Sequence, residues 1–150
     1  MLNIKNISVK NFMSVGNNVQ GVRFDDKQLT LVLGNNLDLG GDGSRNGTGK
    51  TTIINALSYA LYGEALTNIR RDNLINKTNG KGMIVSCDFE LNGTEYRIER
   101  GRRPNVLRLF VNGTEHEDQE QQGDSRETQK QIEKIVGFSH QMFKHIVALN

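Results

Sequence analysis

Apolar and polar side chains alternate most clearly over residues 83–91, where one face of the segment is entirely apolar. A period of two predicts a half-buried strand. Asn92-Gly93 follows as a strong two-residue turn signal, and Tyr96 and Ile98 continue the alternation after it. The pattern predicts an antiparallel hairpin whose inward face carries Met83, Val85, Cys87, Phe89 and Leu91, with Cys87 as a core thiol.

Shorter strand-like patterns occur elsewhere in the chain. They cover residues 4–12, 19–24, 29–33, 106–111 and 146–149. The apolar run 29–33 is short and bounded by Gly34, which is typical of a buried strand. The strand at 106–111 is predicted to end at Asn112-Gly113, with the acidic run behind it forming a loop.

Helical spacing appears in two regions. Apolar residues recur at helical intervals between Ile53 and Leu61, and Gly63 follows as a stop signal, so a helix is predicted to end at Tyr62. A second helix is predicted over residues 129–136, closed by Gly137, and Ser139 could cap a short last helix through Phe143. The fold class is therefore α/β, with a mixed sheet and antiparallel β-hairpins in one domain over residues 1–150.

Composition places the chain in a broad class. Charged residues make up 24% and hydrophobic residues 35% of its 150 positions. No apolar run approaches the ~20 residues that a membrane span needs, and the start lacks the apolar core of a secretion signal. A single cysteine excludes an internal disulfide framework. We expect a cytoplasmic protein without a membrane partner.

The glycine-rich segment 44–52 carries the clearest chemistry. Such a turn points backbone N–H groups inward at a helix N-terminus and forms a nest for an anion. Lys50 can reach the β- and γ-phosphates of a nucleotide, and the Thr51 hydroxyl can bind Mg²⁺. A strand, this turn and a helix follow in the required order, which favours a nucleotide site over a solvated loop. The predicted ligands are ATP and Mg²⁺, held by Arg45, Asn46, Gly47, Thr48, Gly49, Lys50, Thr51 and Thr52.

The motif departs from its usual pattern at one position, because Ser44 stands where glycine is common. Residues 35–44 lie between the strand and the phosphate loop, and we interpret them as an insertion. Asp38 and Asp42 within it could bind a metal ion or could be solvated turn residues.

Basic residues gather outside an acidic segment, residues 115–127, although the net charge is only +2. They could be solvated surface residues, or they could contact the phosphate backbone of DNA without regard to sequence. The candidate DNA-binding residues are Arg70, Arg71, Lys77, Lys81, Arg100, Arg102 and Arg103.

A complete P-loop ATPase also needs an acidic residue after a second apolar strand. The nearest candidate, Val85-Ser86-Cys87-Asp88, alternates like an antiparallel strand and matches poorly. We therefore assign no catalytic residue to this chain. Because the last predicted strand stops one residue before the end, we also expect the sequence to be a fragment.

Several segments together resemble one family. They are the opening Val9-Lys10-Asn11-Phe12-Met13-Ser14, the phosphate loop 45–52, the stretch from Asn55-Ala56-Leu57 to Gly63, and the residue pattern from Val85 to Gly101. In this combination the chain resembles the SbcC-like, SMC-like double-strand-break repair ATPases, including those that bacteriophages encode.

The resemblance implies a P-loop NTPase fold, as the N-terminal lobe of an ABC-type ATPase head. It implies that Asn46 approaches the γ-phosphate and Thr52 the α-phosphate. The implied partners are the chain's own C-terminal lobe, the second head of a homodimer, a partner nuclease subunit and double-stranded DNA or DNA ends. ATP-dependent dimerisation of the heads would then gate the nuclease.

Two further functions stay open on the residues alone. The chain could be a stand-alone nucleotide-binding module that docks on another ATPase and does not hydrolyse ATP. It could also be a small-molecule or nucleoside kinase of similar size, although the antiparallel hairpins of the second half are unusual for that class.

Overall fold

The computed structural model describes residues 2–23, 29–31, 47–66, 68–116 and 125–147. Within them seven strands form one sheet in the order β2-β1-β4-β5-β6-β7, and β3 also pairs with β1. Every described strand pair is antiparallel. The strands are β1 (Leu2–Lys10), β2 (Gln20–Arg23), β3 (Leu29–Leu31), β4 (Met83–Leu91), β5 (Thr94–Arg102), β6 (Val106–Val111) and β7 (Thr114–Glu115).

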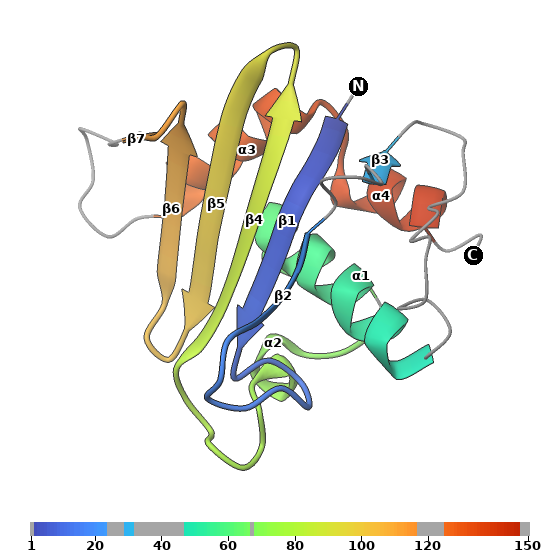
Figure 1. Cartoon of the computed structure of the whole chain (residues 1–150), viewed down its shortest axis with the longest axis vertical. Coiled ribbons are helices and arrows are strands. Elements are labelled where there is room, and N and C mark those ends of the chain that lie inside the picture. The colour runs from blue at the N-terminus through green and yellow to red at the C-terminus, as the bar shows by residue number, and fades with distance from the viewer. Residues whose placement is uncertain (1, 24–28, 32–46, 67, 117–124, 148–150) are drawn as a thin grey trace.

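Four helices accompany the sheet: α1 (Gly47–Tyr62), α2 (Arg71–Leu74), α3 (Ser125–Val136) and α4 (His140–Val147). Figure 1 shows the sheet as one layer with α1 and α3 behind it. The predicted α/β fold class with antiparallel hairpins is confirmed. None of the described helices is long and apolar enough to cross a membrane.

Both Asn-Gly pairs turn the chain as a hairpin. Asn92 and Gly93 have φ angles of 51° and 84°, and Asn112 and Gly113 have 49° and 84°. Two positive φ angles match the right-handed twist of the flanking strands, and Asn and Gly tolerate them best. The second hairpin leads into β7, so Glu115 pairs in the sheet where a loop was predicted.

Strand β1 contains a bulge that explains its uneven apolar spacing. Ile4 pairs with Phe89 and Asn6 with Asp88, so one extra residue of β1 stands against β4. The extra residue shifts the alternation, and Ile4 and Ile7 therefore both face the core although they are three positions apart.

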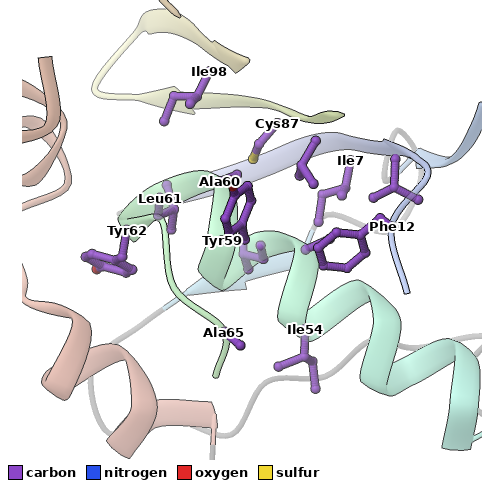
Figure 2. Packing of buried hydrophobic residues seen from close by; sticks show 14 of the residues in the cluster. Ile7, Phe12, Ile54, Tyr59, Ala60, Leu61, Tyr62, Ala65, Cys87 and Ile98 are labelled. Carbon is purple, nitrogen blue, oxygen red and sulfur yellow. The ribbon is translucent and has the colours of Figure 1, made fainter. Parts of the chain in front are cut away.

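The core lies between the sheet and α1. Figure 2 shows Ile7, Cys87 and Ile98 of three neighbouring strands on the side where α1 presents Ala60 and Leu61. All five are at most 3% exposed. Cys87 is thus the predicted core thiol, and burial raises its pKa above the ordinary value.

The C-terminal part differs from the prediction. Helix α3 begins at Ser125 rather than residue 129, and α4 continues from His140 to Val147. The strand predicted over 146–149 is wrong for Ile146 and Val147, which are helical; residues 148 and 149 lie outside the described residues. A run of four apolar residues fits a strand or a helix, and the spacing of Phe143, Ile146 and Val147 is helical. Ser139 caps this helix as predicted, because its Oγ accepts a hydrogen bond from the Met142 amide at 3.1 Å.

Candidate nucleotide site and basic surface

Helix α1 begins inside the glycine-rich motif, at Gly47. The first amides of a helix have no partner within it, so the first turn of α1 offers N–H donors. That turn contains no acidic side chain to repel or replace an anion. Both features fit a polyphosphate with its Mg²⁺. Arg45, Asn46 and the 35–44 insertion lie outside the described residues, and the roles of residues 45–52 stay predictions.

A buried asparagine fixes the start of α1. Asn55 is 1% exposed, and its Nδ2 donates to the Thr51 carbonyl at 3.0 Å. Its Oδ1 accepts a hydrogen bond from the Leu66 amide at 2.9 Å. One side chain therefore ties the turn that carries Thr51 to the segment that follows the helix. Sequence reasoning used Asn55 only as part of a resemblance and missed this role.

The other end of α1 is held by Arg100. Its Nε donates to the Ala60 carbonyl at 3.2 Å, and its Nη2 donates to Gln129 Oε1. Gln129 in turn donates to the Leu61 carbonyl at 3.0 Å. Burial lowers the pKa of Arg100 to about 10, so the group stays charged at neutral pH.

Arg100 was predicted to contact DNA, and the structure corrects this prediction. The side chain is 9% exposed and points to the α1 side of the sheet, where it faces the C-terminal carbonyls of the helix. The signal was present in the sequence. Arg100 stands two positions after Ile98, so the alternation of β5 places both on the inward face.

The other predicted DNA-binding residues lie at or near the surface. Arg70, Arg71, Lys77, Lys81 and Arg103 are exposed, and Arg102 is half-buried. Asp72 of α2 accepts a hydrogen bond from Arg102 Nε at 2.6 Å and lies 3.8 Å from Arg103 Nη2. The hydrogen bond from Arg102 holds the pKa of Asp72 below its usual range.

His140 of α4 joins a polar cluster that sequence reasoning missed. Its Nε2 lies 2.9 Å from Oγ of the buried Ser58 in α1, and its Nδ1 lies 3.1 Å from Glu64 Oε2. Burial lowers the pKa of His140, and the charge of Glu64 opposes that effect. Nothing in the spacing of the three histidines indicated this contact, because Ser58 is 82 positions away.

Asp88 is already engaged by other side chains. It accepts two hydrogen bonds from Arg97 Nη1, at 3.0 and 2.8 Å, and one from Asn6 at 3.2 Å. This pairing supports the interpretation that residues 85–88 are not the magnesium-binding strand of a P-loop ATPase. Across the described ranges, no group of three His, Cys, Asp or Glu residues could hold a metal ion.

Comparison with known proteins places the chain in a family. A family model described as an AAA domain matches residues 6–149. Exonuclease subunit 2 of Enterobacteria phage T4 is 34% identical over 146 residues, which are 97% of this chain and 24% of that protein. The DNA double-strand break repair Rad50 ATPase of Methanococcus maripaludis is 28% identical over 146 residues, covering 96% of this chain and 13% of its own length.

A solved structure shares the fold. The Smc head domain of Pyrococcus furiosus, with an extended coiled coil and bound to the C-terminal domain of ScpA, matches with a TM-score of 0.50. It is 17% identical, and the match covers 91% of this chain and 33% of that one. The chain spans about a quarter of the length of the phage relative. It belongs to the AAA domain family of P-loop ATPases, and its resemblance to the SbcC-like and Rad50-like repair ATPases is confirmed.

Proposed function

We propose that the chain is the ATP-binding N-terminal lobe of an ATPase head that serves a DNA double-strand-break repair or recombination nuclease. The observation that carries the proposal is the start of α1 within the motif 44–52, in a first turn free of carboxylates. The similarity to phage exonuclease subunit 2 and to Rad50 supports the repair context.

In this proposal the chain binds ATP and Mg²⁺ and works in the cytoplasm. Lys50 contacts the β- and γ-phosphates, Thr51 binds the Mg²⁺, and Asn46 and Thr52 contact the γ- and α-phosphates. The head is completed by a C-terminal lobe and dimerises on ATP. Opening and closing of the dimer then gate a partner nuclease at DNA ends.

Calorimetric titration with ATP and Mg²⁺ tests the nucleotide site. Lys50→Ala removes the ammonium group that contacts the phosphates and should abolish ATP binding. Lys130→Ala removes an exposed lysine of α3 and should leave ATP binding unchanged. Thr51→Ala should weaken binding with Mg²⁺ more than binding without it. Normal affinity in Lys50→Ala would refute the placement of the phosphate loop.

The proposed DNA contact uses the exposed cations Arg70, Arg71, Lys77, Lys81 and Arg103 together with Arg102. Phosphate contacts make affinity independent of sequence and dependent on salt. Lys77→Glu with Arg103→Glu should lower affinity evenly across sequences and flatten the salt slope. Lys130→Glu with Lys134→Glu, on α3, makes the same change of charge elsewhere. If the salt slope is the same for the unmodified chain and for both double variants, these cations do not contact DNA.

A further inference from the structure

A pocket of about 580 Å³ lies near the end of α1 opposite to the phosphate-loop motif. Its walls come from the segment after α1, from Arg102 at the end of β5, and from His140 and Lys144 of α4. Because α1 has 16 residues, the two ends of the helix are about 24 Å apart. This pocket is therefore separate from the candidate nucleotide site.

Positive charge exceeds negative charge in the lining. Arg70, Arg71, Arg102 and Lys144 stand against two carboxylates, Glu64 and Asp72. The net charge of these six side chains is thus +2. Such a site favours an anion of matching charge.

The carboxylates leave much of this positive charge available. Asp72 pairs with Arg102 Nε and with Arg103, which lies outside the lining. Glu64 lies 3.7 Å from Arg71 and 3.1 Å from His140. Within the described part of the chain, Arg70 and Lys144 form no ion pair closer than 4.0 Å, and both are exposed. Guanidinium groups bind phosphate oxygens in pairs, and lysine adds a point charge.

The shape and charge of the pocket favour a single phosphate group over the continuous phosphodiester backbone of DNA. Cations from three parts of the chain line one pocket, whereas Lys77, Lys81 and Arg103 lie outside its lining. A phosphodiester carries one negative charge, but a phosphate monoester carries about 1.5 to 2 at neutral pH. The monoester therefore matches the lining better.

We propose that this pocket binds the terminal phosphate monoester of a DNA end. The proposal rests on the DNA contact proposed above and gives it a preferred feature, the phosphorylated terminus. His140 lines the pocket and contacts Ser58 of α1. The NMR signal of its ring therefore reports locally on whether the pocket is occupied.

Binding of two hairpin duplexes tests the proposal. They differ only in a 5′-phosphate or a 5′-hydroxyl at their single end, and fluorescence anisotropy at fixed salt gives both affinities. The phosphorylated hairpin should bind roughly tenfold more tightly, the gain expected from charged hydrogen bonds to one extra dianion. Both titrations use the Lys50→Ala protein as well, so that the phosphate loop cannot account for the difference.

Two matched variants locate the preference. Arg70→Gln with Lys144→Gln changes exposed residues of the pocket and should bring the two affinities together. Lys77→Gln with Lys81→Gln removes the same charge outside the pocket and should weaken both hairpins while keeping their ratio. Circular dichroism melting checks that both variants are folded.

The outcomes separate this proposal from the general DNA contact. Equal affinity for both hairpins in the unmodified chain overturns the pocket and leaves the DNA contact standing. If neither hairpin binds, the DNA contact fails, and titration with inorganic phosphate decides whether the pocket recognises phosphate. Movement of the His140 ring resonance in the unmodified chain, and its loss in the pocket variant, supports the site; a resonance that stays still overturns it.

Discussion

Arg100 is a buried cation whose hydrogen-bond partners are neutral. It donates to the Ala60 carbonyl and to Gln129, and its guanidinium carbon lies 5.9 Å from the centre of the Tyr59 ring. The C-terminus of a helix carries partial negative charge, so the end of α1 acts in place of a carboxylate. The cost of burying the charge is offset by this arrangement, which also joins β5, α1 and α3.

Replacing Arg100 by Met should therefore destabilise the fold. The change leaves the Ala60 carbonyl and Gln129 Oε1 without their donor, and each unsatisfied group costs about 1–3 kcal/mol, so we expect a loss of about 3 kcal/mol. Urea unfolding measures it. Arg103→Met changes an exposed arginine of the same region and should cost less than about 0.5 kcal/mol. Equal midpoints for the two variants would contradict the role given to Arg100.

His140 should make stability depend on pH. Burial lowers its pKa below the ordinary histidine value of 6.5, so the folded state binds fewer protons than the unfolded state near that pH. The free energy of unfolding should therefore fall as the pH drops below 6.5. His140→Gln should flatten this part of the profile, measured by urea unfolding at several pH values. His145→Gln changes an exposed histidine of the same helix and is the matched control. An equal change of the profile in both variants would contradict the role given to His140.

At the scale of elements, the C-terminal end of α1 depends on a glycine. Gly63 has a φ of 74°, its amide bonds to the Tyr59 carbonyl, and a Cβ there would lie 2.6 Å from Arg100 Nη1. A left-handed residue with a side chain costs about 1–2 kcal/mol even in open space. Gly137, which ends α3, has a φ of 86° and no atom within 4 Å of such a Cβ.

The pair of variants Gly63→Ala and Gly137→Ala separates strain from crowding. Both variants should be less stable, because alanine is strained in the left-handed region. Gly63→Ala should lose more stability than Gly137→Ala, because its methyl group displaces Arg100 from the helix end. Thermal and urea unfolding of both proteins give the difference. Similar losses at the two sites would mean that the guanidinium moves aside without consequence.

These elements also show how far the sequence predicts the fold. Asn92-Gly93 and Gly63 were predicted correctly because a local backbone need selects those residue types. The bulge in β1 and the helical state of Ile146 and Val147 were missed, because short apolar runs fit more than one periodicity. The site follows the same rule: the motif 44–52 is local, whereas the contacts of Arg100 with Gln129 and of His140 with Ser58 join residues 29 and 82 positions apart.

At the scale of the whole molecule, α1 connects the candidate sites. Its first turn lies in the phosphate-loop motif, and its last turn is fixed by Arg100, Gln129 and the Tyr62 hydroxyl, which donates to the Phe138 carbonyl at 2.9 Å. The proposed end-phosphate pocket begins at Glu64, just beyond that last turn. Helix α1 therefore spans the distance between the candidate nucleotide site and the proposed pocket.

ATP hydrolysis by this chain should stay at background even when ATP is bound. Asp88, the nearest match to a magnesium-binding acid, is held by Arg97 and Asn6, and the chain covers about a quarter of the phage relative's length. In the proposed function, the remaining parts of the ATPase head come from outside these 150 residues. Phosphate release with Mg²⁺, compared with Lys50→Ala, measures the rate. A turnover near ~1 s⁻¹, which is typical of working phosphoryl-transfer enzymes, would show that this chain supplies its own catalytic acid.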